Sequence, residues 1–157
     1  MRVISILLVD DHAMIRKLLR RHLELQSDFI VVGEAGNGRE GIAKAEDLRP
    51  DVILMDVSMP GMDGIEATRI ICERLPQIKV LILTLYASSE NCIRAMQSGA
   101  SGYVLKDSVD EEIETAVRAI MKGSHYFGMG ATDAAGRLFP APSGRPPCPG
   151  LPDISEC

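Results

Sequence analysis

Five polar residues stand at the ends of predicted strands, and their types suit phosphoryl chemistry. Asp10 and Asp11 follow the first apolar run, Asp56 follows the third, Thr84 ends the fourth, and Lys106 follows the fifth. Three carboxylates at one place would repel one another, so either one of them protonates or a cation joins them. Oxygen-only ligands favour a hard cation such as Mg²⁺. A carboxylate can then attack phosphorus and form an acyl phosphate, while a lysine and a hydroxyl group bind other phosphoryl oxygens.

Each of these residues also has an ordinary explanation when it is taken alone. Asp10 and Asp11 could simply cap the helix that follows them, and a lone aspartate after a strand is commonly a turn residue. Lys106 alone would be a solvated surface charge, and Thr84 alone would be an ordinary strand residue. The functional hypothesis therefore depends on their joint placement.

Five short aliphatic or β-branched runs predict the strands that position these residues. The runs are Val3–Val9, Phe29–Glu34, Val52–Met55, Val80–Thr84 and Gly102–Leu105. Segments with helical spacing of apolar residues separate them. Strict alternation of continuous apolar strands with helices predicts an α/β fold with a doubly wound, five-stranded parallel sheet. In such a sheet ligands bind outside the carboxyl ends of the strands, which is where the five polar residues stand.

Local sequence signals mark where several helices begin. Three pairs of residues have the spacing of a capping box: Asn37 with Glu40, Asp63 with Glu66, and Ser108 with Glu111. In each pair we expect the first residue to accept a hydrogen bond from a backbone N–H group that the helix leaves without a partner.

Composition excludes several classes of protein. Hydrophobic residues make up 46% of the chain but aromatic residues only 4%, which predicts a largely aliphatic core. The net charge is −5 and no basic run occurs, which argues against direct binding of nucleic acid. The apolar run near the N-terminus, Ile6–Val9, is too short to span a bilayer and no signal-peptide pattern precedes it, so we expect a soluble cytoplasmic protein with reduced cysteines and no membrane partner.

The character of the sequence changes near Gly123. Residues 123–157 are rich in glycine and proline, and neither the helical nor the strand period continues there. We therefore expect a folded domain over residues 1–122 and a disordered tail over residues 123–157.

Four stretches together resemble a response-regulator receiver domain over residues 1–122. They are Leu7–His12, Asp51–Gly64, Val80–Thr84 and Gly99–Lys106. The resemblance implies the flavodoxin-like, CheY-like strand order 2-1-3-4-5. It also implies Mg²⁺-dependent phosphorylation by a sensor histidine kinase in a cytoplasmic two-component pathway.

The same resemblance implies a role for each site residue. Asp56 resembles the phosphoacceptor, Asp11 the direct metal ligand, Asp10 its acidic neighbour, and Ser58 the residue whose backbone carbonyl completes the metal site. Lys106 resembles the lysine that binds the phosphoryl group, and Thr84 and Tyr103 resemble the switch pair. A half-buried strand aromatic with no switching role is the alternative for Tyr103.

Finer detail is similar to the LuxR-type (NarL/FixJ-like) subfamily, notably Asp56–Pro60 and Lys106–Ser108. Asp107 stands where many receivers have proline, which removes the expectation of a cis peptide bond. LuxR-type regulators continue into a helix-turn-helix domain, and nothing after Gly123 resembles one. The parent family regulates transcription, but we expect no direct DNA binding here and an effect through protein contacts, including a homodimer or a heterodimer with a full-length regulator. The alternative is that the tail has no physiological role.

Two other functions compete with a signalling receiver. A haloacid-dehalogenase-type phosphatase also forms an aspartyl phosphate, but it carries an Asp-x-Asp pattern after its first strand, whereas this chain has Asp10-Asp11. An unphosphorylated scaffold would not need the set Asp11, Asp56, Thr84 and Lys106. We expect no enzymatic activity beyond Mg²⁺-dependent self-phosphorylation from a donor and slow autodephosphorylation.

Overall fold

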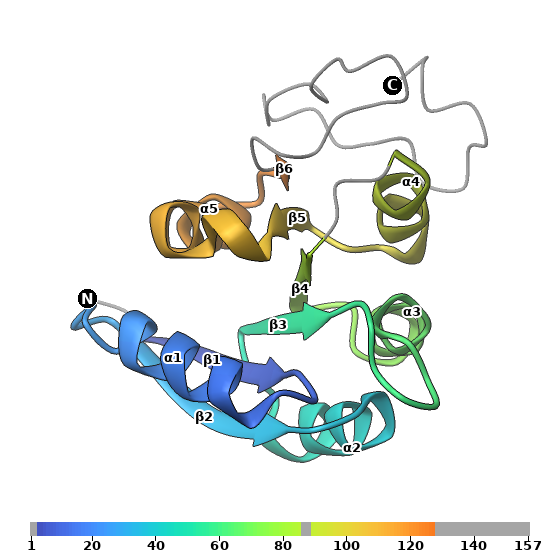
Figure 1. Ribbon diagram of the computed structural model, residues 1–157, viewed down its shortest axis with the longest axis horizontal. Helices are drawn as coiled ribbons and strands as arrows, with labels where there is room; N and C mark the ends of the chain where they lie inside the picture. Colours follow the sequence, from blue (N-terminus) through green and yellow to red (C-terminus); the bar gives the residue numbers. More distant parts are fainter. Residues whose placement is uncertain (1–2, 86–88, 128–157) are drawn as a thin grey trace.

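A parallel sheet lies between two layers of helices in the part of the chain that the computed structural model describes, residues 3–85 and 89–127 (Figure 1). The strand order in these residues is β2-β1-β3-β4-β5-β6. The strands are β1 (Ile4–Val9), β2 (Phe29–Ala35), β3 (Val52–Asp56), β4 (Lys79–Thr84), β5 (Gly102–Leu105) and β6 (Tyr126–Phe127). The predicted doubly wound sheet and its order 2-1-3-4-5 are confirmed.

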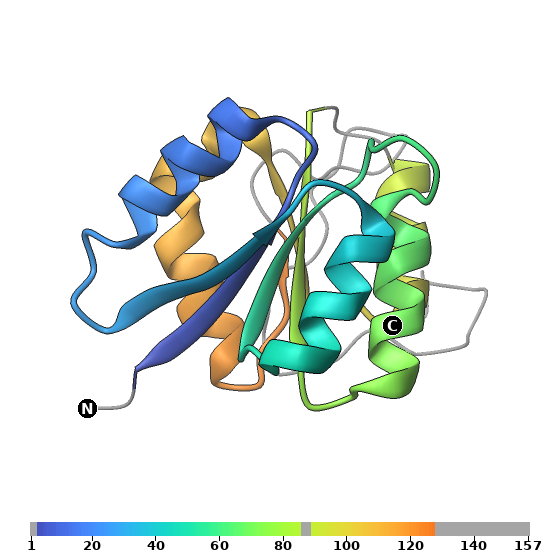
Figure 2. The ribbon, with the colours of Figure 1, turned by 90° about the horizontal axis from the view of Figure 1, so that it is seen from below.

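The helices cover both faces of the sheet. They are α1 (Ala13–Leu23), α2 (Gly38–Leu48), α3 (Gly64–Arg74), α4 (Ser89–Ser98) and α5 (Val109–Met121), and a short 3-10 helix, η1 (Lys106–Ser108), precedes α5. Helices α1 and α5 pack on one face, and α2, α3 and α4 pack on the other (Figures 1 and 2). The strands between them are apolar on both sides for this reason, and every residue of β3 is buried.

The five predicted strands form, and no end differs by more than one residue from its expected bound. Val3 lies outside β1 and is exposed, whereas Lys79 extends β4 at its start. Two of the predicted capping residues act as expected. Asn37 accepts a hydrogen bond from the N–H of Glu40, and Asp63 accepts one from the N–H of Glu66. The third predicted pair is Ser108 with Glu111, and it spans the point where η1 ends and α5 begins.

The structure adds one strand that the sequence did not predict. β6 pairs in parallel with β5, with Tyr126 opposite Gly102 and Phe127 opposite Tyr103. The Tyr126 hydroxyl donates a hydrogen bond of 2.8 Å to the buried carboxylate of Glu112. The prediction that no regular structure follows Gly123 is therefore wrong for residues 126–127, because pairing with a neighbouring strand can order a segment too short to show a period. The rest of the predicted tail, residues 128–157, lies outside the described residues.

Candidate functional site

The parallel sheet brings the three predicted carboxylates together. Strands β1 and β3 are neighbours, with Val9 opposite Met55, so Asp10 and Asp56 emerge side by side at the carboxyl edge. Ligand atoms of Asp10, Asp11, His12 and Asp56 all lie within 4.8 Å of one another. Asp10 and Asp56 are buried, whereas Asp11 and His12 are exposed. The edge of the sheet therefore carries a concentrated negative charge that is open to solvent on one side.

Lys106 joins two of these carboxylates. Its Nζ lies 2.8 Å from Oδ2 of Asp10 and 3.0 Å from Oδ1 of Asp56. Burial lowers the pKa of Lys106, but its hydrogen bonds to Asp10 and Asp56 more than offset this effect, so its pKa lies above the ordinary value. The ammonium group therefore stays charged and bridges the strands that carry the two aspartates.

Asp56 keeps one oxygen without a partner. Among the described residues, its Oδ2 is buried and accepts no hydrogen bond. Burial raises the pKa of Asp56, and the charges of Asp10 and Asp11 raise it further, while the hydrogen bond from Lys106 acts in the opposite direction. A buried carboxylate oxygen without a partner is unfavourable. Binding a cation or forming a covalent bond at this Asp56 oxygen would therefore remove an unfavourable burial.

The donor set fits a hard cation. Asp10, Asp11 and Asp56 offer carboxylate oxygens, which are the ligands that Mg²⁺ accepts in small numbers while it keeps several waters. Ser58 lies in the loop after β3, two residues beyond Asp56, and is exposed. His12 was not among the predicted site residues, and its Nδ1 lies 3.0 Å from Oδ1 of Asp11.

Gly64 fixes the loop that follows Asp56. A Cβ atom at Gly64 would lie 1.9 Å from the backbone oxygen of Asp56, so a side chain cannot be accommodated there. The N–H of Gly64 donates a hydrogen bond of 2.9 Å to the carbonyl oxygen of Val57. Nothing in the residue pattern signals this role, although Gly64 directly follows the predicted cap Asp63. The start of α3 is thereby packed against the backbone of the central aspartate.

The two predicted switch residues lie inside the protein. Thr84, the last residue of β4, is 4% exposed and belongs to the strand next to β3. Tyr103 in β5 is fully buried, within the core cluster on the side of α3 and α4. The alternative expectation of a half-buried aromatic at Tyr103 is therefore wrong in its burial, because the side chain is fully buried. Both residues belong to strands that lie on the same side of Asp56 in the sheet.

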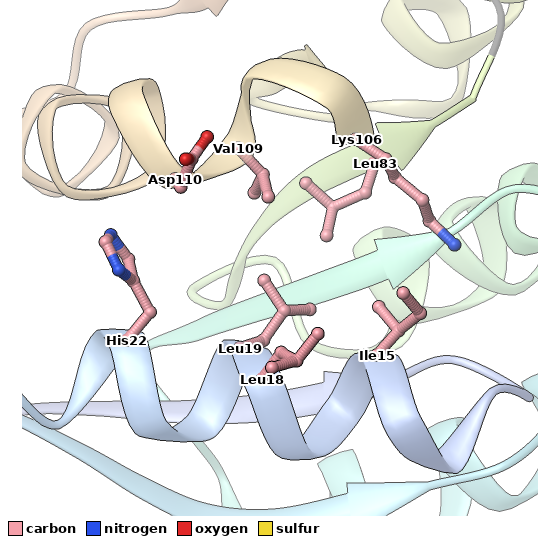
Figure 3. Close-up of a pocket in the computed structure, with 8 residues that line it drawn as sticks. All are labelled: Ile15, Leu18, Leu19, His22, Leu83, Lys106, Val109 and Asp110. Atoms are coloured by element: carbon pink, nitrogen blue, oxygen red, sulfur yellow. The ribbon is translucent and has the colours of Figure 1, made fainter.

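An apolar pocket of about 360 Å³ adjoins the acidic site (Figure 3). It opens between α1 and the start of α5. The lining residues are Ile15, Leu18, Leu19, His22, Leu83, Lys106, Val109 and Asp110. The aliphatic stem of Lys106 forms part of the wall, while His22 and Asp110 lie at the other end of the pocket (Figure 3). The pocket is therefore continuous with the residue that bridges the carboxylates.

Comparison with known proteins identifies the family. Residues 6–118 match the response regulator receiver domain. The chain is 47% identical over 124 residues to the response regulator protein VraR of Staphylococcus aureus, an alignment that covers 79% of this chain and 59% of VraR. The chain thus spans less than two thirds of the length of this relative.

Solved structures agree with this result. A LuxR-family two-component response regulator from Aurantimonas sp. SI85-9A1 superposes with a TM-score of 0.75 at 38% identity, covering 77% of this chain and 86% of the other. The signal receiver domain of the putative response regulator NarL from Mycobacterium tuberculosis gives a TM-score of 0.75 at 33% identity, covering 78% of this chain and 99% of the other.

None of the described helices has both the length and the apolar character that a membrane span requires. The strand order, the acidic edge with its bridging lysine and the similarity over residues 6–118 all agree. This chain belongs to the response regulator receiver domain family, with LuxR-family regulators among its relatives.

Proposed function

We propose that Asp56 accepts a phosphoryl group from a phosphohistidine of a sensor kinase. The observation that supports this most strongly is its buried Oδ2, which has no hydrogen-bond partner in the described residues, beside an Oδ1 bound by Lys106. In the reaction Oδ2 attacks phosphorus, an oxygen–phosphorus bond forms, and the nitrogen–phosphorus bond of the donor breaks. The electron pair of that bond stays on the departing imidazole.

The neighbouring residues assist this transfer. Lys106 pairs with a phosphoryl oxygen, and the hydroxyl group of Thr84 donates a hydrogen bond to another. The carboxylates of Asp10, Asp11 and Asp56 and the backbone carbonyl of Ser58 would hold Mg²⁺. When it is bound, this ion supplies positive charge that offsets the charge of the phosphoryl oxygens. The buried, unpartnered oxygen and the three-carboxylate donor set support this assignment.

Phosphorylation would act as a switch by shifting a pre-existing equilibrium between two conformations. Thr84 would move toward the phosphoryl group, and Tyr103 would occupy the space left inside. The burial of both residues, in strands on the same side of Asp56, supports this proposal.

The chain would act on itself and not on a separate substrate. The proposed phosphoacceptor, Asp56, is the last residue of β3, whereas a dehalogenase-type phosphatase places its nucleophile after the first strand, where this chain has Asp10-Asp11. Steady turnover of a phosphate ester by the purified protein would favour the enzyme instead.

We further propose that the chain acts in the cytoplasm, where the ATP that kinases use is available.

The α1 side of the acidic site is the surface we assign to the kinase. We expect such a receiver to contact a sensor histidine kinase, and RcsB, a relative of known structure, forms dimers. Met14 and Leu18 of α1 are 69% and 54% exposed, and Leu18 also lines the apolar pocket. A homodimer or a heterodimer with a full-length regulator is the second proposed contact. Leu18→Ala should slow transfer from the kinase and leave uptake from a small phosphodonor unchanged. Equal slowing of both reactions would contradict this docking surface.

One experiment tests the proposed chemistry directly. The protein is incubated with a small phosphodonor and Mg²⁺ and then analysed by intact mass. A single added phosphoryl group is expected for the wild type and none for Asp56→Ala. Full labelling of Asp56→Ala would show that another residue is the acceptor.

A further inference from the structure

One side chain of α1 reaches past the carboxylates to the backbone that carries them. Arg16 donates a hydrogen bond through NH1 to the carbonyl oxygen of Asp10 and another, of 3.0 Å, through Nε to Oε1 of Glu34. We propose that Arg16 is a positioning residue that holds Asp10 in its Mg²⁺-binding orientation by tying the end of β1 to Glu34 in β2. This inference rests on the proposed function, because it concerns the same metal site.

Asp10 is fixed at each of its polar groups. Its N–H donates a hydrogen bond of 3.0 Å to the carbonyl oxygen of Ala35, and its own carbonyl oxygen accepts from Arg16. Its Oδ1 accepts a hydrogen bond of 2.8 Å from the N–H of His12, and its Oδ2 accepts one from Lys106. Because the peptide plane after Asp10 leads directly to Asp11, the Arg16 contact fixes the backbone between the two adjacent carboxylates.

Glu34 in turn fixes Arg16. Its Oε1 binds Nε of Arg16, and its Oε2 lies 3.1 Å from NH1 of Arg20. The backbone oxygen of Glu34 also accepts a hydrogen bond from Lys44. The side chains of Arg16 and Glu34 are only 20% and 29% exposed, so solvent competes weakly for these contacts. The planar guanidinium group serves two acceptors in a fixed geometry, which the point charge of a lysine cannot reproduce.

Two roles for Arg16 predict opposite results. If Arg16 acted only through its positive charge, removing it would make the acidic site more negative and strengthen Mg²⁺ binding. If it positions Asp10, removing it should weaken Mg²⁺ binding, since outer contacts that orient metal ligands typically change affinity by about 10- to 100-fold. Whether Mg²⁺ affinity falls or rises therefore distinguishes a positioning role of Arg16 from a purely electrostatic one.

The chain offers a matched control in Arg20. It lies one turn further along α1 and binds the same Glu34 carboxylate, but its second contact is the carbonyl oxygen of Val31, at 3.2 Å, and not Asp10. Arg20→Ala removes the same charge and the same kind of ion pair. It should leave Mg²⁺ binding unchanged or strengthen it.

The test is a calorimetric titration of the full chain with Mg²⁺ alone. Arg16→Ala should bind Mg²⁺ about 10-fold more weakly than the wild type. Arg16→Lys should also bind Mg²⁺ more weakly, because it keeps the positive charge but loses the planar guanidinium group. At saturating Mg²⁺ both variants should take up a phosphoryl group from a small donor as the wild type does. This recovery is expected because a defect in Mg²⁺ affinity alone disappears once the site is filled.

Several results would overturn the inference. Mg²⁺ binding by Arg16→Ala that equals or exceeds that of the wild type would exclude a positioning role. Equal weakening by Arg16→Ala and Arg20→Ala would assign the effect to Glu34 or to the helix in general. If Arg16→Ala fails to fold, as a melting curve would show, Arg16→Lys carries the same comparison. A wild type that binds no Mg²⁺ would overturn the proposed metal site together with this inference, whereas normal wild-type binding with unaffected Arg16 variants would overturn the inference alone.

Discussion

Gly64 lies against the backbone of Asp56 so closely that a Cβ atom at this glycine would lie 1.9 Å from the Asp56 carbonyl oxygen. The phosphoacceptor candidate and the first residue of α3 are thus packed main chain to main chain. A backbone atom cannot move aside as the end of a flexible side chain can, so the contact ties the geometry of the site to the start of α3.

Replacing Gly64 by alanine should therefore damage both stability and site geometry. Overpacking of this kind typically costs about 1–3 kcal/mol, and a contact with the backbone places the variant at the upper end. Urea denaturation measures the free energy of unfolding. Gly36→Ala is the control, because the added Cβ would approach other atoms only at 3.8 Å. Equal stability of the two variants would show that the loop relaxes freely.

The stability of the protein should depend on pH through Asp56. Its pKa is raised in the folded state, chiefly by burial, so ionisation of this group disfavours folding. This penalty is absent below the ordinary pKa of 3.8, grows as the pH rises above it, and is complete once the pH exceeds the folded-state pKa. Without Mg²⁺, Asp56→Asn should be more stable than the wild type at pH 7, and the difference should vanish as the pH falls toward 4.

Thermal melts across this pH range measure the effect. Asp47→Asn, on an exposed position of α2, is the control for the loss of one negative charge. A wild type that is more stable than Asp56→Asn at pH 7 would show that the Lys106 contact outweighs the burial of the carboxylate.

Loss of Lys106 should destabilise the protein in a way that Mg²⁺ reverses. Lys106→Met removes the cation that bridges Asp10 and Asp56, and removing one partner of a buried ion pair costs about 3 kcal/mol. Mg²⁺ should then raise the melting temperature of this variant more than that of the wild type, because it replaces the missing positive charge. Lys17→Met, on the exposed face of α1, is the control. An equal Mg²⁺ effect in Lys106→Met and the wild type would argue that the metal and the lysine act on different groups.

Thr84→Ala should separate phosphorylation from the response to it. The variant keeps Asp56 and Lys106, so it should still gain one phosphoryl group by intact mass. The change in amide exchange around Tyr103 on phosphorylation should be reduced, because the hydroxyl group that is proposed to contact the phosphoryl group is missing. Thr115→Ala, on the exposed face of α5, should respond like the wild type. An undiminished response in Thr84→Ala would count against the switch.

Much of the fold and the acidic cluster could be predicted because each depends on local patterns. Continuous apolar runs such as Val52–Met55 mark strands covered on both faces, and Asn37 and Asp63 cap helices through their own side chains. The carboxylates come together because parallel strands share one carboxyl edge, a rule that needs no knowledge of packing.

Other features depend on distances that the sequence does not encode locally. The two residues of β6 show no period; they pair with β5, and Tyr126 packs on the core cluster beside α5 and donates a hydrogen bond to Glu112. The close approach of Gly64 to Asp56 cannot be read from residue type. The reach of Arg16 depends on how β2 is placed beside β1.

The parallel direction of β6 also sets which way the backbone runs at Phe127, the last described residue. Because β6 pairs with the first two residues of β5 and runs the same way, the chain at Phe127 points toward the carboxyl edge that holds Asp56. A fluorophore or a fused protein attached at this point would begin one strand away from Tyr103. A reporter at this position could therefore test the proposed switch at Tyr103 without replacing any residue of the acidic site.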